Sequence, residues 1–203
     1  MRVESSGADT GQDSLLPAVV EPLLRGRFGR PYTFLERCES TQRELGADHP
    51  EGAVVAADEQ TAGRGRLGRE WLTEPGTSLL FSINLVPPIE TQRLPELSIL
   101  AGRAAADGIE EATGLRPEIK LPNDLLVEGR KLAGILAEAR DARVVLGVGI
   151  NVNVRREALP SGVDTPPTSL LVELGHPVPR APLLAAILAA LERHYDDWIA
   201  SAA

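Results

Sequence analysis

Three glycines alternate with three arginines in one seven-residue stretch, from Gly63 to Arg69, called here the Gly/Arg loop. Arginines this close repel one another, and glycines lose more conformational freedom than other residues when they become ordered. A bound anion would offset both costs, because guanidinium groups form forked hydrogen bonds with carboxylates and phosphates. The loop therefore favours an anion site, and the alternative is a solvated hairpin turn.

The glycines of this loop also have the spacing of two familiar phosphate-binding motifs, but their neighbours fit neither motif. The G-x-G-x-x-G fingerprint needs a helix directly after it. Here Pro75 and Gly76 follow too soon for a helix of useful length. The P-loop pattern fails because Arg69–Glu70 stands where Lys followed by Ser or Thr is required.

A second polar cluster runs from Lys120 to Asp124 and continues at Lys131. Its Pro-Asn-Asp segment is ordinary turn chemistry. Lys131 differs, because it lies at the entry to an apolar strand where its stem can be buried and its ammonium held as a point charge. Such a charge could neutralise a carboxylate that attacks a phosphate. The alternative is an edge-strand lysine that discourages aggregation.

Glycines also interrupt a long apolar strand, at Gly147 and Gly149. Glycines inside a strand mark a bulge or a place where a ligand or another backbone comes close. Asn151, at the end of this strand, offers a donor and an acceptor to the edge of a heterocycle. Packing and ligand contact explain the two glycines about equally well from the sequence.

The elements that must position these clusters form an α+β pattern. Strands are predicted near 32–35, 53–57, 78–85, 116–120, 125–127, 133–139 and 144–150, and the last is apolar enough to be central. Helices are predicted over 15–24, from 40, over 95–112 and over 181–199, with a proline-rich loop at 155–167. We expect a largely antiparallel sheet with helices packed on one face, in a single domain over 14–203 after a disordered 1–13.

Bulk properties narrow the class of protein. The 203 residues suit one domain, and a net charge of −8 argues against nucleic acid as a partner. Cys38 is the only cysteine, which excludes an intrachain disulfide and a cysteine-based zinc site, and we expect a buried free thiol. No apolar run approaches the about 18 residues that span a bilayer, and no signal peptide is evident. The sequence predicts a cytoplasmic protein without a membrane partner.

Taken together, the clusters resemble the biotin–protein ligases, also called biotin–[acetyl-CoA-carboxylase] ligases. The resemblance covers roughly residues 32–199 and implies the catalytic-domain fold that is shared by biotin and lipoate ligases and is similar to class II synthetases. It rests on these segments, in the family's order: Glu39–Gln42, Asp58–Arg69 with Trp71, Lys120–Asp124, Arg130–Leu136 and Gly147–Asn151.

The resemblance implies a reaction in two steps. Biotin and Mg-ATP give biotinyl-5′-AMP and pyrophosphate, and a lysine of a biotin carboxyl carrier domain then takes the biotinyl group as an amide. The first step brings a carboxylate to a phosphate, so the site needs fixed positive charge aimed at the reacting atoms. The resemblance gives this catalytic role to Lys131, Arg64 and Arg66.

The other site residues are likewise implied by the resemblance. The biotin-binding set is Ser40, Thr41, Gln42, Gln60, Arg64, Gly65, Arg66, Lys131, Gly134 and Gly149. The nucleotide-binding set is Arg64, Arg66, Arg69, Trp71, Lys120, Asn123 and Asn151. Asp124 is the candidate ligand of Mg²⁺, and the Gly/Arg loop would fold over the reactive intermediate and shield it from water and stray amines.

The sequence departs from the family in three places. Leu121 stands where the family often has Trp. The residues before Tyr32 are too few for the helix-turn-helix domain of bifunctional members, so a ligase without repressor function is expected. The sequence stops at Ala203, directly after the last predicted helix, where most members continue into a small β-barrel. The resemblance also allows a homodimer.

Two other classes of function compete with this interpretation. A lipoate–protein ligase or octanoyltransferase shares the fold and a catalytic lysine, but those families favour another glycine-rich motif, and Cys38 is misplaced for the transferase nucleophile. A non-catalytic protein could instead bind biotin or biotinyl-AMP on the same scaffold. Lys131 and the three arginines argue against that class, because a pure binder of biotin does not need phosphate-facing charge.

Overall fold

The computed structural model describes residues 13–71, 73–88, 93, 95–140 and 143–201 of the chain. Most of the predicted disordered segment, residues 1–12, lies outside them. Asp13, which that prediction included, is described, and its carboxylate pairs with Arg180.

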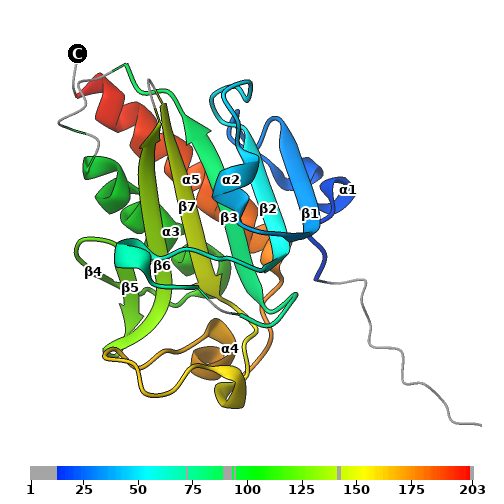
Figure 1. Cartoon of the computed structure of the whole chain (residues 1–203), viewed down its shortest axis with the longest axis vertical. Coiled ribbons are helices and arrows are strands. Elements are labelled where there is room, and N and C mark those ends of the chain that lie inside the picture. The colour runs from blue at the N-terminus through cyan, green and yellow to red at the C-terminus, as the bar shows by residue number, and fades with distance from the viewer. Residues whose placement is uncertain (1–12, 72, 89–92, 94, 141–142, 202–203) are drawn as a thin grey trace, which may run out of the picture.

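A single seven-stranded sheet forms the centre of the molecule (Figure 1). β1 and β2 are parallel and the other neighbouring pairs are antiparallel, which confirms the predicted α+β class. The central strands β3 and β7 are mostly buried, as expected for apolar runs covered on both faces. Across the sheet the order is β1 (Tyr32–Cys38), β2 (Val54–Gln60), β3 (Ser78–Leu85), β7 (Arg143–Asn151), β6 (Arg130–Arg140), β5 (Asp124–Val127) and β4 (Glu118–Lys120).

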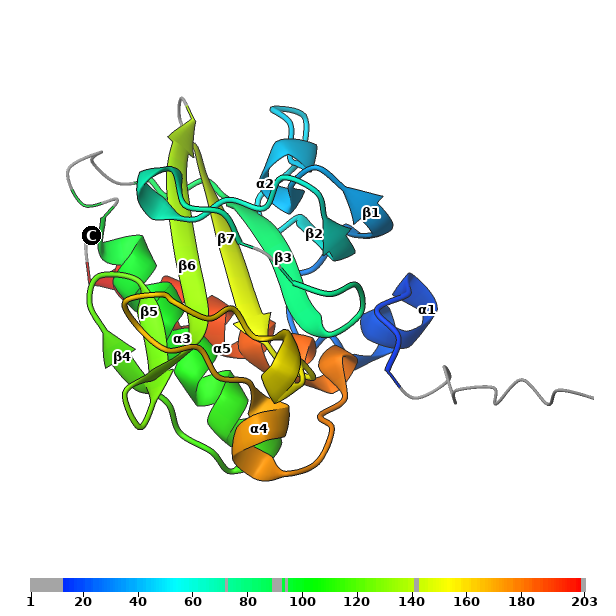
Figure 2. The ribbon, with the colours of Figure 1, turned by 60° about the horizontal axis from the view of Figure 1, so that its bottom comes forward.

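Two long helices cover one face of the sheet, α3 (Glu96–Thr113) and α5 (Arg180–Ala200) (Figure 2). They pack closely because Gly108 of α3 has no side chain, and a Cβ there would lie 2.6 Å from Cα of Ile187. The expectation of helices on one face holds for these two. The short α2 (Thr41–Glu44) lies on the opposite face, over a small apolar cluster that includes Leu45 and Val145.

The remaining elements are short. The predicted helix over 15–24 is instead α1 (Pro17–Val20) followed by the 3₁₀ turn η1 (Glu21–Leu23). The predicted loop at 155–167 contains the 3₁₀ turn η4 (Arg156–Ala158). The five-residue α4 (Leu170–Leu174) was not predicted; Ser169 caps its start, and Gly175 ends it in the left-handed conformation. Among the described residues, no helix has the length and apolarity that crossing a membrane requires.

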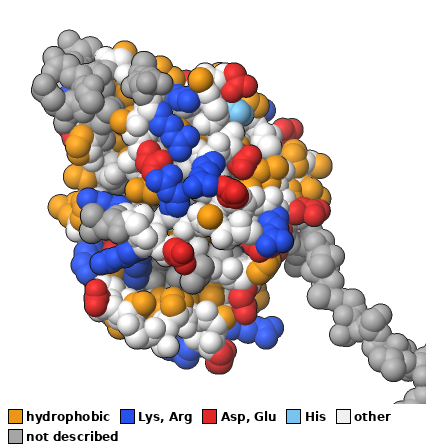
Figure 3. Space-filling model, in the orientation of Figure 1, with side chains coloured by type: hydrophobic (Ala, Val, Ile, Leu, Met, Phe, Trp, Pro, Cys, Tyr) orange, Lys and Arg blue, Asp and Glu red, His pale blue; other side chains and the backbone are white. Residues whose placement is uncertain are grey.

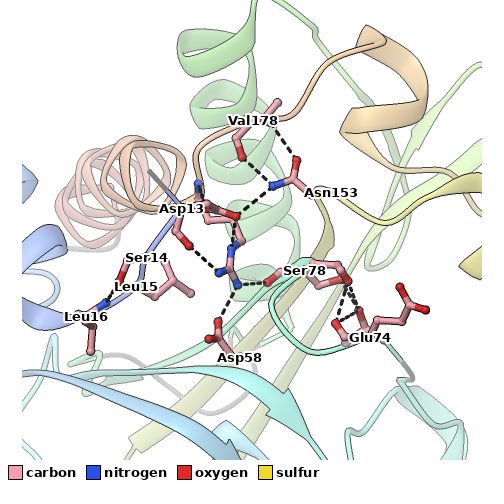
Figure 4. A network of polar contacts seen from close by, with 12 residues as sticks. Asp13, Ser14, Leu15, Leu16, Asp58, Glu74, Ser78, Asn153 and Val178 are labelled. Atoms are coloured by element: carbon pink, nitrogen blue, oxygen red, sulfur yellow. Dashed lines mark hydrogen bonds and ion pairs between the residues drawn. The ribbon is translucent and has the colours of Figure 1, made fainter. Parts of the chain in front are cut away.

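Arg180, the first residue of α5, is buried and joins three distant segments. Its partners Asp13, Asp58 and Ser78 are labelled in Figure 4. Its guanidinium contacts Oδ2 of Asp13 at 2.9 Å and Oδ1 of Asp58 at 2.7 Å. It also donates to the carbonyl oxygen of Ser78 at 3.1 Å. A cation is unfavourable at the positive end of a helix, so the two carboxylates offset both its burial and its position. The contacts fix the strands on either side of the Gly/Arg loop.

Candidate active site

A cavity of about 420 Å³ opens on the face of the sheet that carries α2. Its volume is within the usual range for small-molecule sites. The walls come from the start of α2, the end of β2, the Gly/Arg loop and the middle of β6 and β7. Most of the predicted site residues line it: Ser40, Thr41, Gln42, Gln60, Arg64, Gly65, Arg66, Arg69, Trp71, Asn123, Asp124, Lys131, Gly134 and Gly149.

A second cavity, of about 340 Å³, adjoins the first. Its own wall is formed by Asn151 and by residues of the 160–167 segment, among them Asp164 and Thr165. Five residues line both cavities: Arg69, Glu70, Trp71, Asp124 and Lys131. Two ligand-sized spaces therefore meet at one lysine and one tryptophan.

The deep end of the first cavity is uncharged and rich in hydrogen-bonding groups. Gln60 accepts from the backbone N–H of Thr41 at 2.8 Å and from its hydroxyl at 3.1 Å. Ser40 stands at the N-cap of α2, but its hydroxyl does not cap the helix, so it is available to the cavity. This end can recognise a neutral polar group by donors and acceptors rather than by charge.

The side chain of Gln42 stabilises the wall of the first cavity by hydrogen bonds to two strands. Its side-chain amide donates to the carbonyl oxygens of Leu136 at 3.0 Å and Val145 at 3.2 Å, which lie on neighbouring strands. A Cβ at Gly147 would come within 3.0 Å of the Gln42 side chain. Gly147 therefore makes room for a protein side chain.

Trp71 lies across β6 and β7 at the boundary of the two cavities. A Cβ at Gly134 would come within 2.9 Å of its ring, and a Cβ at Gly149 within 2.8 Å. The indole Nε1 is buried and has no hydrogen-bond partner among the described residues. The glycines thus seat the indole against the sheet, and Nε1 is a donor that a ligand could satisfy.

Lys131 carries the positive charge at the junction of the cavities. Its ammonium nitrogen lies 2.8 Å from Oδ1 of Asp124 and 5.7 Å from the centroid of the Trp71 ring. The side chain is 26% exposed, so its stem is buried while the charge faces the cavities. β6 begins at Arg130 rather than at 133, and Lys131 is therefore fixed within a strand.

The Gly/Arg loop crosses in front of β6 and β7 as a tight hairpin, the turquoise segment of Figure 1. Its centre is the 3₁₀ turn η2 (Arg66–Gly68), so neither phosphate-motif helix is present. Arg64 pairs with Glu138 of β6 at 2.5 Å, and Arg66 donates to Oδ1 of Asn123 at 3.3 Å. In Figure 3, basic and acidic side chains are interspersed around the middle of this face.

Comparison with known proteins identifies the family. A family model described as "Biotin/lipoate A/B protein ligase family" matches residues 34–154, more than half of the chain. The chain belongs to this family.

Relatives and solved structures extend the match beyond the family model. The bifunctional ligase/repressor BirA of Bacillus subtilis is 40% identical over 171 residues, which are 81% of this chain and 53% of BirA. A biotin–[acetyl-CoA-carboxylase] ligase of Mycobacterium tuberculosis is 36% identical over 93% of this chain and 75% of its own length. The biotin protein ligase of Aquifex aeolicus, solved with biotin and ATP, superposes with a TM-score of 0.76 at 31% identity, over 83% of this chain and 72% of that one. The chain spans about half the length of the BirA relative.

Two predicted nucleotide-binding residues do not line the first cavity. Lys120 lines neither cavity, and its ammonium donates to the hydroxyl of Thr165 at 3.3 Å. Asn151 lines only the second cavity, and its amide donates to the carbonyl oxygen of Thr168 at 2.9 Å. Asn151 thereby anchors the segment that forms the outer wall of that cavity.

Two features of the site were not predicted. The first is Glu138, which pairs with Arg64. Glu138 is the only acidic residue within β6, and an acid in a mostly apolar strand could have been recognised from the sequence as a candidate site residue. The second is the segment 160–167, which forms the outer wall of the second cavity and carries no recognisable sequence motif.

The described residues bear on two further predictions. Within them, no group of three His, Cys, Asp or Glu side chains lies close enough to hold a metal ion. Asp124 is a single carboxylate already paired with Lys131, so it could contribute one ligand to an ion that a phosphate also holds. Cys38 is half-buried on β1, and burial raises the pKa of its thiol to about 11, with a smaller contribution from Glu44. It lines neither cavity.

Proposed function

We propose that this chain is an ATP-dependent biotin ligase. It would activate biotin as biotinyl-5′-AMP and pass the biotinyl group to a lysine of a biotin carboxyl carrier domain. The meeting of the two cavities at Lys131 carries the proposal, because a reaction between two bound molecules needs adjoining sites with the charge at their junction. The relatives named biotin ligases, and the related structure with biotin and ATP, support the choice of substrates.

The first cavity suits biotin. Its uncharged deep end, with Ser40, Thr41 and Gln60, offers hydrogen bonds to the ureido group. Aliphatic and aromatic side chains line the middle, where an acyl chain can lie. The carboxylate would then reach Lys131 at the junction.

The second cavity would take the nucleotide, with its α-phosphate directed toward Lys131. A carboxylate oxygen of biotin attacks the α-phosphorus, and the bond to pyrophosphate breaks. Lys131, with Arg66 and Arg69 at the cavity mouth, reduces the repulsion between the two anions and stabilises the charge that develops. In the second step an amine nitrogen attacks the carbonyl carbon, AMP leaves, and the amine proton passes to solvent.

Mg²⁺ fits this scheme as an ion held by Asp124 together with the phosphates of ATP. When bound, it would neutralise charge on the departing pyrophosphate. We place the reaction in the cytoplasm, where ATP and carrier domains are available. A homodimer, which the family resemblance allows, stays a proposal that light scattering can test.

Biotin-dependent exchange between ATP and pyrophosphate tests the adenylation step directly. We expect exchange that requires biotin, is not supported by lipoate, and is lost in Lys131→Ala. Arg193→Ala, an exposed residue of α5 on the far side of the sheet, is the matched loss of one positive charge and should retain exchange. Biotin binding in calorimetry without any exchange would instead identify a non-catalytic biotin-binding protein.

A further inference from the structure

Lysine is nearly absent from this chain. Of the 21 basic residues counted as Lys or Arg, only Lys120 and Lys131 are lysine, and all the others are arginine. Both lysines lie beside the cavities, Lys120 as the last residue of β4 and Lys131 as the second residue of β6. The rest of the surface carries its positive charge on guanidinium groups.

The scarcity of lysine limits which groups of the chain an acyl-adenylate could modify, a consequence that rests on the proposed function. A mixed anhydride acylates neutral primary amines. Arginine keeps its proton at any pH the protein meets, so it supplies charge without supplying a nucleophile. Lys120 and Lys131 therefore carry the only side-chain amines of this sequence that escaping biotinyl-AMP could modify.

Lys131 is poorly suited to be such an acceptor. The carboxylate of Asp124 lies 2.8 Å from its ammonium nitrogen, and the Trp71 ring lies beneath the charge. Both contacts hold the ammonium against the protein, so the nitrogen would have to leave them to reach a carbonyl carbon. Its mostly buried stem also fixes the direction from which the nitrogen can approach a carbonyl carbon.

Lys120 has the opposite surroundings. It is exposed, and the partner of its ammonium is a neutral hydroxyl, that of Thr165 at 3.3 Å. Thr165 lines the second cavity, and Pro122, two residues beyond Lys120, lines the first. The Lys120 amine thus lies at the rim of the space proposed for the activated intermediate, without occupying it.

We propose that Lys120 is the internal biotin acceptor of this protein when no carrier domain is bound. The neutral Nζ attacks the carbonyl carbon of biotinyl-5′-AMP, a carbon–nitrogen bond forms, the carbon–oxygen bond to the phosphate breaks, and AMP leaves with the electron pair. The proton of the amine passes to solvent. Because Lys120 lies at the rim, it meets the intermediate at a higher effective concentration than a distant amine does.

The experiment uses the full chain with biotin and ATP and without carrier, followed by peptide mapping in a mass spectrometer. The Arg193→Lys variant adds one exposed amine on α5, on the far side of the sheet, as an internal reference. We expect biotin on Lys120, several-fold less at position 193, and none on Lys131. Lys120→Arg should remove the main labelled peptide while its positive charge is kept.

Three results would overturn the inference. Equal labelling at Lys120 and position 193 would mean that location at the rim does not matter. Biotin on Lys131 in place of Lys120, or none on Lys120 while ATP–pyrophosphate exchange is active, would exclude Lys120 as the acceptor and leave the proposed function intact. Absence of biotin-dependent exchange would overturn the proposed function and this inference with it.

Discussion

The indole of Trp71 lies against the backbone of Gly149, so closely that a Cβ at that position would come within 2.8 Å of Cε2. Gly134, on the neighbouring strand, bears the same relation to Cζ3 at 2.9 Å. One ring thus covers two glycines and forms part of the wall of both cavities. The position of Trp71 should therefore be sensitive to a single methyl group.

Gly149→Ala is expected to push the indole away from β7 and to weaken biotin and ATP binding. Overpacking of this kind costs about 1–3 kcal/mol. Calorimetry with each ligand measures the loss. Gly102→Ala is the control, because a Cβ there would meet its nearest neighbour at an ordinary 3.6 Å. Unchanged binding in Gly149→Ala would show that the ligands do not depend on where the indole lies.

Glu138 joins the Gly/Arg loop to the deep end of the first cavity. It pairs with Arg64 at 2.5 Å and with Arg140 at 3.1 Å, and Arg140 donates to the carbonyl oxygen of Gln42 at 2.9 Å. Glu138→Gln should loosen Arg64 and lower the affinity for biotinyl-AMP. For partly exposed pairs the loss is about 1 kcal/mol, a factor of about five.

Binding of a non-hydrolysable biotinyl-AMP analogue measures this effect, at low and at high salt. The matched control is Glu110→Gln, which breaks a pair with Arg116 on the far side of the sheet. Equal affinity in both variants would mean that the Arg64–Glu138 pair does not hold the loop over the ligand.

The sequence predicted the seven strands and the two long helices, because long apolar runs and periodic patterns depend on local residues alone. It also predicted most of the first cavity, since family motifs mark the residues that line it. The role of Gly149 stayed open, because the side chain that covers it, Trp71, is far away in the sequence. Contacts between residues so far apart in the sequence can be recognised only once the fold is known.

The same reason explains the contacts of Lys120 and Asn151. Lys120 belongs to a family motif, but a three-residue edge strand places its ammonium beside Thr165, on the outer wall of the second cavity, so that Lys120 itself lines neither cavity. Asn151 ends an apolar strand, as expected, and its side-chain amide donates a hydrogen bond to the carbonyl oxygen of Thr168. A motif gives a residue's identity and order, whereas its hydrogen-bond partner depends on segments that arrive from elsewhere.

The burial of Arg180 predicts that removing its side chain lowers the free energy of unfolding far more than removing that of an exposed arginine. Its side chain is 3% exposed and pairs with two carboxylates, so Arg180→Ala should lower the free energy of unfolding by about 3–5 kcal/mol. Arg25→Ala removes a surface pair with Glu111, worth at most about 1 kcal/mol. Urea unfolding measures both. Similar losses in the two variants would contradict the structural role given to Arg180.

Cys38 gives a prediction for the effect of pH. Burial raises its thiol pKa to about 11, and only the thiolate reacts with alkylating reagents. Iodoacetamide should therefore modify the folded protein slowly near neutral pH, with a rate that increases up to about pH 11. The urea-unfolded chain is the control and should react at an ordinary rate. A folded-state rate that levels off near pH 8 would contradict the raised pKa.

Arg66 lies where the Gly/Arg loop meets the turn at Asn123, 3.3 Å from its side-chain oxygen. Arg66→Gly removes this contact and a positive charge from the mouth of the first cavity, while adding flexibility to the loop. The activated biotin should then escape before a carrier docks, and a lysine-rich bystander protein should acquire more biotin than with the parent chain. Arg155→Gly, an exposed arginine that lines neither cavity, controls for loss of charge. Since escape needs the intermediate to form, ATP–pyrophosphate exchange is measured on the same samples. Exchange without any rise in bystander labelling would show that Arg66 does not retain the intermediate.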